Sequence, residues 1–432
     1  MRDILITLMV FATIPAIFYR PYVGVLVWSW LAYMVPHRLA WGFAATFPFA
    51  QIVGVVTLIS LLFSSEKKRI PINAVTVVWI AYVIWMNITT LFALSPDMAM
   101  IEWDRVMKIQ LFSFISLMLM YGRDRINYLI IVIVVSIGLY SVKGGLFAFF
   151  GGTGRVYGPS GGFFEDNNSM GLAAVMMLPL MAYLYSIANK RYLKLAMIGV
   201  LGFTVLAILS TQSRGAFLAV STTIAYLWYR STKKTLIGIV ILCAAPVFWF
   251  SMPDHWHDRM ATIKTYEEDG SAMGRINAWE FAYNVAVDRP IVGGGFRVFQ
   301  PDNFERYAPD PENFHDAHSI YFEILGEHGF VGLTLFLLLG FLAYRAAGQV
   351  IKMTKWNDEL GWANMLGRMM QACLVAYATG GLFLGLAYWD LYYHFIVIVV
   401  LLREHVNSVL ADNRRQIGEN LQPAGEAGRQ GA

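Results

Sequence analysis

Long apolar runs, separated by short polar connections, make up most of the chain. The first two runs, each about 15 residues long, are short for a membrane crossing, which needs roughly 20 residues. Arg20-Pro21 divides them, and because proline removes a backbone donor, we interpret residues 1–35 as one broken crossing. The pattern therefore predicts about twelve membrane-crossing helices. The apolar runs lie at residues 4–18, 22–35, 43–63, 74–94, 106–121, 127–150, 170–187, 195–211, 215–229, 235–251, 329–347, 369–387 and 390–402.

Composition agrees with this pattern. Of the 432 residues, 57% are hydrophobic and 14% are charged, and the mean hydropathy is +0.53. A chain this apolar is not a soluble globule, so we predict an all-helical polytopic membrane protein whose surroundings are membrane lipids and not nucleic acid. The two cysteines, Cys243 and Cys373, lie inside apolar runs, which indicates neither a disulfide framework nor a metal motif.

Basic clusters predict how the chain is oriented. Lys and Arg gather in every second connection, as expected of cytoplasmic loops, and both termini are then expected inside. The loop at 151–169 and the long polar insert at 252–317 would face outward. The polar tail, with Gly and Pro, is expected to be disordered. The predicted divisions are a transmembrane bundle at 1–251, a helical insert at 252–317, C-terminal transmembrane helices at 318–403 and a cytoplasmic tail at 404–432.

The insert leads into AHSIYFEILGEHGFVG (317–332). If Asp316 caps the next helix, His318 lies in its first turn, where the helix dipole favours an anion and disfavours an imidazolium. A neutral imidazole beside an anion site is a candidate general base. His315 and Asp316 have passable spacing for a metal site with His318, but there is no HExxH and no nearby cysteine. We therefore expect no metal.

Three further stretches are candidates for the outer face. Arg214, in Thr211-Gln212-Ser213-Arg214-Gly215, must lie at the membrane boundary, where it either snorkels to headgroups or holds a lipid phosphate. Residues 270–296 are predicted to form an amphipathic helix in which Trp279 can orient Arg275, although an interfacial helix alone would explain that arginine. The glycine-rich loop 151–171 is either a ligand loop or an ordinary turn; it carries Arg155, Tyr157 and Asn168.

These stretches resemble a known family. The combination of TQSRG at 211–215 with Leu218, MGRINAWEFAYNVAVDRPIVGGGF at 273–296, and His318 followed by Gly329 is similar to the O-antigen ligase and polymerase superfamily of bacterial inner-membrane glycosyltransferases. Residues 20–50 resemble its exosortase A-associated O-glycosylation ligases. GFFEDNN at 162–168 stands where many relatives have an Asn-Pro-Asn type sequence.

The resemblance implies a GT-C-type fold that needs no metal or other cofactor. It implies transfer of a glycan from undecaprenyl diphosphate to an acceptor hydroxyl, such as that of lipid A core, on the periplasmic side. His318 matches the catalytic histidine, and Arg214 and Arg275 match the two diphosphate-binding arginines. Arg297 is a weaker candidate for the second arginine.

Other functions remain open at this point. An O-antigen-type polymerase or a protein O-oligosaccharyltransferase would share these residues, since only the acceptor differs. A transporter of polyprenyl-linked lipids would instead favour charged residues at mid-membrane and interrupted helices in two related halves. In the sequence, the notable polar groups lie in predicted outward loops, which favours a transferase.

Overall fold

The computed structural model describes residues 1–152, 154–235, 238–239, 242 and 270–421, and over these residues it contains helices and no strands. Within these described residues, seven helices are long and apolar enough to cross a membrane. The prediction of an all-helical, multi-pass membrane protein is therefore confirmed. The predicted apolar run 235–251 and the first part of the insert, 252–269, lie almost entirely outside the described residues. The seven helices are α1 (Arg2–Tyr19), α4 (Ala74–Leu91), α6 (Arg123–Phe149), α7 (Asn167–Ile187), α8 (Arg191–Ser210), α14 (Ile320–Met353) and α16 (Asp390–Leu421).

The N-terminal helices form a hairpin. Asp3, at the start of α1, accepts hydrogen bonds from the backbone N–H groups of Gly42 (3.0 Å) and Ala44 (3.1 Å), which follow α2 (Tyr22–Met34). At the other end of α1, Ser60 of α3 (Phe49–Phe63) donates to the Ile17 carbonyl. Because α1 and α2 run in opposite directions, the prediction of one broken crossing in residues 1–35 is wrong: the Arg20-Pro21 turn reverses the chain.

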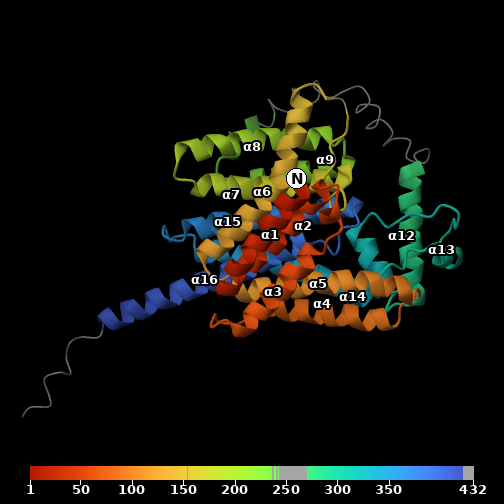
Figure 1. The fold of residues 1–432 in the computed structure, drawn as a ribbon, viewed down its shortest axis with the longest axis horizontal. Coiled ribbons are helices and arrows are strands. Elements are labelled where there is room, and N and C mark those ends of the chain that lie inside the picture. The colour runs from red at the N-terminus through yellow and green to blue at the C-terminus, as the bar shows by residue number, and fades with distance from the viewer. Residues whose placement is uncertain (153, 236–237, 240–241, 243–269, 422–432) are drawn as a thin grey trace, which may run out of the picture.

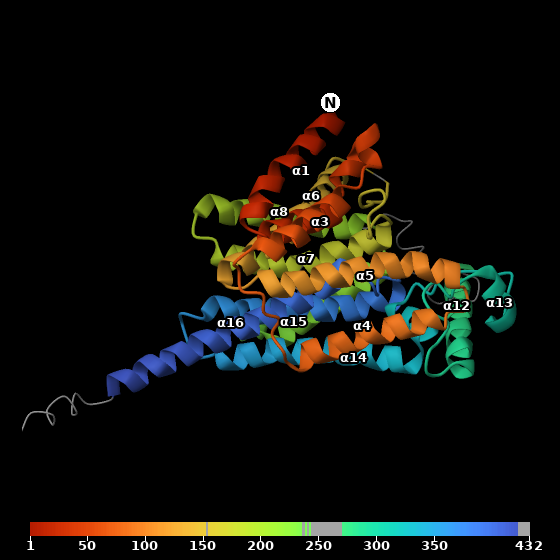
Figure 2. The ribbon, with the colours of Figure 1, turned by 60° about the horizontal axis from the view of Figure 1, so that its bottom comes forward.

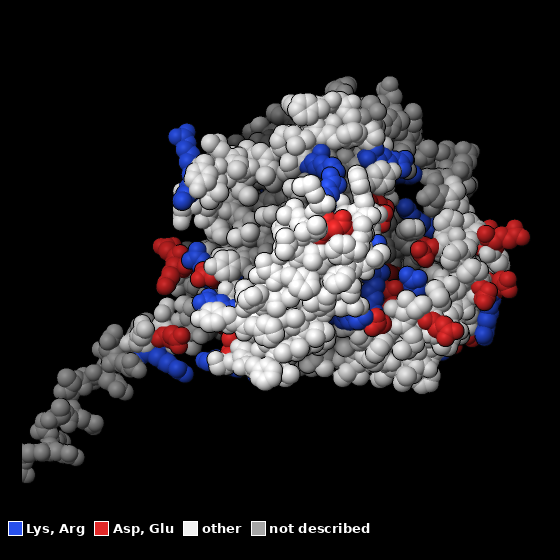
Figure 3. Space-filling view, in the orientation of Figure 1, with Lys and Arg blue, Asp and Glu red and all other residues white. Residues whose placement is uncertain are grey.

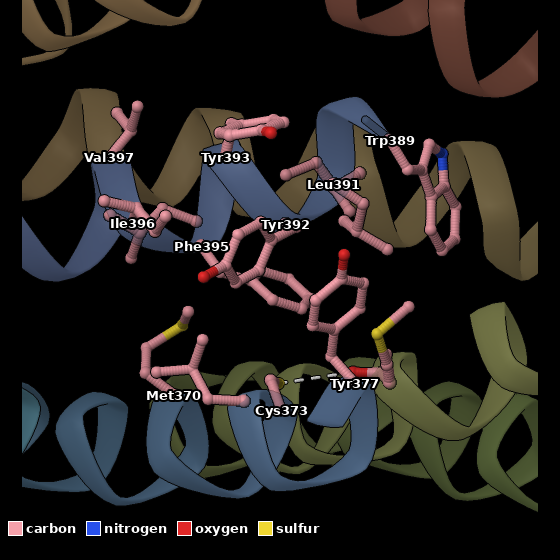
Figure 4. Packing of buried hydrophobic residues seen from close by; sticks show 14 of the residues in the cluster. Met370, Cys373, Tyr377, Trp389, Leu391, Tyr392, Tyr393, Phe395, Ile396 and Val397 are labelled. Atoms are coloured by element: carbon pink, nitrogen blue, oxygen red, sulfur yellow. Dashed lines mark hydrogen bonds between the residues drawn. The ribbon is translucent and has the colours of Figure 1, made fainter. Parts of the chain in front are cut away.

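Most remaining helices run side by side along the long axis of the molecule (Figures 1 and 2). Beside those already named, the bundle contains α5 (Pro96–Leu119), α9 (Arg214–Arg230) and α15 (Gly361–Gly380). α16 is central, because its stretch from residue 390 to 402 is buried on every side. Such all-round burial suits LYYHFIVIVVLL, which has no charged residue. In Figure 4, Tyr377 of α15 and Tyr392 of α16 face each other; their rings stack with centroids 4.4 Å apart.

Alternate loops meet at one end of the bundle, as the basic clusters predicted. Arg125 pairs with Glu66 at 2.6 Å, and Tyr121 donates a hydrogen bond to the Arg69 carbonyl. Residues 404–408 of α16 line the same region. Figure 3 shows charged side chains gathered toward the two ends, with a broad uncharged area between them. Asp3 lies at the end of α1 away from residues 60–69, so the expectation that both termini share one side is wrong.

The start of the C-terminal tail is helical. α16 continues to Leu421, whereas the composition predicted disorder from residue 404. Residues 404–421 contain strong helix formers and no proline, and Val406 is still fully buried. The burial of Val406 and the favourable helix propensity of the residues that follow it let α16 extend beyond the bundle.

Candidate functional site

A break in α14 shapes the floor of the site. Gly329 has φ 67° and ψ −170°, which interrupts the helix and deprives the Gly326 and Glu327 carbonyls of their usual partners. The N–H groups of Gly294 and Gly295 bond to these two carbonyls, both at 2.8 Å, while Phe330 N–H donates to the Pro290 carbonyl. The backbone of Gly294 and Gly295 therefore occupies the break in α14. These hydrogen bonds fix the position of the segment that continues to Arg297.

Close approach explains why glycines stand on both sides of this contact. A β-carbon on Gly329 would lie 2.6 Å from the Ile291 carbonyl oxygen, and one on Gly293 would lie 2.5 Å from the Gly329 nitrogen. Both residues also have positive φ, which disfavours other side chains. The loop and the broken helix can pack this tightly only without β-carbons.

His318 lies just before α14 and not in its first turn. The helix begins at Ile320 with Ser319 at the N-cap, so the prediction that Asp316 caps it is wrong. Buried Ala317 is held against α12 (Gly270–Asp288), because the Trp279 indole donates to its carbonyl at 2.8 Å. This anchor keeps residues 316–318 out of the helix, and His318 takes a left-handed φ of 41°.

A pocket of about 380 Å³ opens beside His318. Loops and helix ends far apart in the sequence form it: the start of α5, the end of loop 151–166, the segment 297–300 and the segment 384–388. Among the residues predicted from sequence, His318, Arg297 and Asp316 line it. Further polar lining residues are Glu102, Arg105, Asp166, Ser169, Gln300, Glu323, Glu327 and Tyr388.

Arg297 is held by two carboxylates. Its Nε lies 3.1 Å from Glu102 Oε2, and its backbone N–H donates to Glu327 Oε1 at 2.7 Å. Arg105 lies 3.6 Å from the other Glu102 oxygen. Arg297 also has a left-handed φ of 54°. Such strained backbone persists only where surrounding contacts enforce it. Here the contacts with Glu102 and Glu327 hold Arg297 in the wall of the pocket.

Glu327 belongs to a buried hydrogen-bond chain behind the pocket. The Tyr388 hydroxyl contacts Glu327 Oε2 and lies 2.8 Å from His328 Nε2. His328 Nδ1 in turn lies 2.6 Å from the Thr89 hydroxyl. The chain joins α4, α14 and the segment before α16, and so fixes three elements around the site.

Electrostatics favour a neutral His318. Removal of water by the surrounding protein lowers its pKa below the ordinary 6.5, even though part of the ring remains exposed to the pocket. The positive charge of Arg275 lowers the pKa further, while Asp316 opposes it. The structure thus brings Arg275 of α12 within electrostatic reach of the imidazole, which can accept a proton at neutral pH.

Arg214 is the first residue of α9 and does not line the pocket. Ser213 caps this helix by accepting from Ala216 N–H at 3.2 Å. The preceding turn is tied to α7, since the Asn167 side chain donates to the Thr211 carbonyl at 2.8 Å. A β-carbon on Gly215 would lie 3.6 Å from Phe383, which also meets the Trp279 ring and precedes Leu384 of the pocket lining.

Comparison with known families identifies the part of the chain that builds this site. Residues 199–337 match the family described as O-antigen ligase. This match covers about a third of the chain and supports a relationship to the O-antigen ligase superfamily. Residues 1–189 match a family of unknown function, DUF5935. A search of the curated proteins found no match. The O-antigen ligase match spans Arg214, Arg275, Arg297 and His318 and supports a glycan-transferring enzyme in the membrane.

Several other residues predicted as supports do not line the pocket that the structure describes. Arg155 and Tyr157 are exposed on their loop. The Asn168 N–H bonds to Asp166, the N-cap of α7, so the loop ends as a conventional helix cap. The His315 ring packs against Gly274, next to Arg275. Among the described residues, no group of three or more His, Cys, Asp or Glu could hold a metal ion.

Sequence reasoning missed three carboxylates, one arginine and one tyrosine in the pocket. Glu102, Arg105 and Tyr388 lie in connections between the predicted apolar runs, and Glu323 and Glu327 lie just before one. One signal was present: Glu323 and Glu327 stand four residues apart in an otherwise apolar stretch, which places both on one helix face. The missed residues are Glu102, Arg105, Glu323, Glu327 and Tyr388.

Proposed function

We propose that this chain transfers a glycan from undecaprenyl diphosphate to an acceptor hydroxyl, such as one of lipid A core, at the periplasmic face of the bacterial inner membrane. The observation that carries the proposal is the pocket: His318 and Arg297, both inside the O-antigen ligase match, line it together. Its position at the end opposite the basic loops agrees with an outward-facing site.

In the proposed reaction, His318 is the general base. The acceptor O–H bond breaks, its proton moves to the imidazole, and the acceptor oxygen forms a bond to the anomeric carbon. The bond between that carbon and the phosphate oxygen breaks, and undecaprenyl diphosphate leaves with the electron pair. An in-line displacement of this kind inverts the anomeric centre. General-base assistance typically contributes about 10²- to 10⁴-fold in rate.

Charge supports placing the diphosphate at the rim and the glycan inside. Five Asp and Glu residues line the pocket against two Arg residues, and Glu102 faces both arginines. A diphosphate would be repelled from Asp166 and Asp316, whereas sugar hydroxyls can donate to carboxyl oxygens of the pocket. Arg275, whose charge acts on His318, and Arg214, at the start of α9, would hold the leaving diphosphate through forked, charge-assisted hydrogen bonds. This arrangement requires no metal.

The proposal includes a GT-C-type architecture with multiple crossings and the predicted divisions at residues 251 and 317. The helical character of α12 (Gly270–Asp288) and α13 (Pro301–Tyr307) supports a helical insert. α12 packs on the outer end of α14, where Trp279 stacks on Phe322 at 5.0 Å, and α13 packs on α12, where Phe281 stacks on Phe304 at 4.2 Å.

One observation favours a transporter as the second candidate. α14 is interrupted at Gly329, and Glu323 and Glu327 lie in its outer half, as transporters of ionic substrates often require. The break is filled by the Gly293–Gly295 backbone and therefore leaves no passage at that point. We accordingly place transport second.

The test uses purified protein, a polyprenyl-diphosphate-linked glycan and three acceptors: lipid A core, a second lipid-linked glycan, and a peptide with Ser and Thr. The proposal expects release of polyprenyl diphosphate and a lipid A core product. Transfer to the second acceptor would reassign the chain as a polymerase, and transfer to the third as a protein O-oligosaccharyltransferase. Movement of uncleaved lipid across a vesicle membrane would support the transporter and contradict the proposal.

A further inference from the structure

A second polar site lies at the opposite end of the bundle, between α9 and α15. There a crevice of about 300 Å³ is lined by Arg230 in the last turn of α9 and Arg368 of α15, together with Ser231. Its walls include the apolar side chains of Met365 and Met369. This crevice shares no lining residue with the pocket beside His318.

The two arginines meet no counter-charge among the described residues that line the crevice with them. None of the described residues that line the crevice is acidic. Within the described part of the chain, the one hydrogen bond of the Arg368 side chain runs from Nε to Asn364 Oδ1 at 2.8 Å, and Arg230 has neither a hydrogen bond nor an ion pair. Arg368 is only half-exposed and lies well inside α15. A guanidinium in such a place is costly unless an anion neutralises it.

The neutral polar side chains of the crevice do not take the place of an anion, because they form hydrogen bonds with one another. The Tyr226 hydroxyl donates to Gln371 Oε1 at 2.9 Å and lies 3.0 Å from the Tyr344 hydroxyl. The Gln371 amide donates to the Tyr344 carbonyl at 3.1 Å. The N–H groups at the far end of the Arg368 fork therefore remain available to a ligand.

An apolar groove continues from this point. Tyr344, which meets Tyr226 at the crevice, also lines a groove of about 220 Å³ between α14 and α15, with Leu337 and Phe341 of α14 partly exposed at its edge. A ligand that places an anion between two arginines and a hydrocarbon chain along neighbouring helices is an anionic phospholipid. Basic pockets between transmembrane helices bind such headgroups.

We propose that Arg230 and Arg368 form a binding site for the phosphodiester headgroup of an anionic phospholipid, with its acyl chain on the α14–α15 groove. This site goes beyond the proposed transfer reaction and does not depend on it. The forked guanidinium of Arg368 would bind two phosphate oxygens, and Arg230 would contribute a second positive charge at the mouth.

The experiment is native mass spectrometry of the full chain, titrated with phosphatidylglycerol or with phosphatidylcholine. The wild type should retain phosphatidylglycerol preferentially. The double variant Arg230→Gln/Arg368→Gln should bind it at least about tenfold more weakly. Arg368→Lys should show an intermediate loss, because an ammonium keeps the charge but cannot fork. Arg230→Gln alone, at an exposed helix end, should fold normally and still weaken binding.

The matched control is Lys352→Gln/Lys355→Gln, which removes two charges from exposed positions that line neither the crevice nor the groove. Its affinity for phosphatidylglycerol should equal that of the wild type. An equal loss in the control, or equal retention of both lipids by the wild type, would overturn the proposal. So would displacement of the lipid by inorganic phosphate alone, since that result would show a simple anion site.

Discussion

Two residues at the pocket, Arg297 and His318, have left-handed backbone although neither is glycine. Each costs about 1–3 kcal/mol in local strain. A different contact enforces each of these two backbone conformations. Glu327 accepts a hydrogen bond from the Arg297 N–H, and the Trp279 indole donates one to the carbonyl of Ala317, just before His318. Strain of this kind is typical of functional sites. Here it accompanies the placement of the Arg297 guanidinium and the His318 imidazole at one pocket.

The pKa of His318 gives the first prediction. A base whose pKa is lowered stays neutral as the pH falls, so the transfer rate of the wild type should decline only below pH 6.5. Because the charge of Arg275 contributes to this shift, Arg275→Gln should raise the pKa and move the decline to higher pH, beside any loss of rate. The pH profile of transfer, with NMR titration of the His318 ring, measures this. Arg306→Gln on α13 should leave the midpoint unchanged; an unchanged midpoint in Arg275→Gln would refute the prediction.

Glu327 gives the second prediction, which concerns stability. Glu327→Ala removes the acceptor of Arg297 N–H and of the Tyr388 hydroxyl, and each buried donor left unsatisfied costs about 1–3 kcal/mol. The free energy of unfolding in detergent should fall accordingly, and Glu327→Gln should retain part of it. Glu280→Ala, at an exposed position of α12, should change stability by less than about 0.5 kcal/mol. Equal effects at the two positions would mean that the buried chain does not hold the site together.

At the scale of elements, the central feature is the contact between the loop 290–295 and the broken α14. The helix gives up its own hydrogen bonds at Gly329, and the loop replaces them with backbone groups of Gly294, Gly295 and Pro290. This exchange places Arg297, two residues past the glycines, against Glu102 of α5. The break thus positions a site residue and is not a defect of the helix.

Gly329→Ala gives the third prediction. The added methyl would lie 2.6 Å from the Ile291 carbonyl oxygen at a positive φ, so the variant should lose more than about 1 kcal/mol of stability. Transfer should fall as well, because the Arg297 loop would shift. Thermal unfolding and a transfer assay measure the two effects. Gly202→Ala in α8, with nothing within 4 Å, should be neutral or stabilising by up to about 1 kcal/mol; a comparable loss there would contradict the steric argument.

For the whole molecule, apolar runs and basic clusters predicted the helical bundle and the gathering of alternate loops at one end, because burial in lipid and charge asymmetry both leave direct traces in the sequence. They could not predict the N-terminal hairpin. Whether α1 and α2 continue or reverse depends on tertiary bonds such as Asp3 to Gly42 and Ser60 to Ile17. These contacts join residues about 40 positions apart, and no local pattern encodes them.

The same limit applies to the site. Motifs pointed to His318 and Arg297, which line one pocket, and to Arg275, whose charge reaches the imidazole. The cap assigned to Asp316 failed because Trp279, 37 positions earlier in the sequence, holds the Ala317 carbonyl. Glu102 and Arg105 were missed because they lie before the apolar run 106–121, in a stretch that the pattern assigned to no helix but that forms the start of α5. Only the packing of α5 against the segment 297–300 gives them a place in the pocket.

The central claim is that His318 takes the acceptor proton in a site that binds the lipid-linked glycan independently of it. The most direct measurement compares His318→Ala with the wild type in single-turnover transfer and in binding of the same polyprenyl-diphosphate glycan. We expect the transfer rate to fall by about 10²- to 10⁴-fold while the dissociation constant of the donor stays within about twofold of the wild-type value. Transfer at the wild-type rate by His318→Ala would contradict the account.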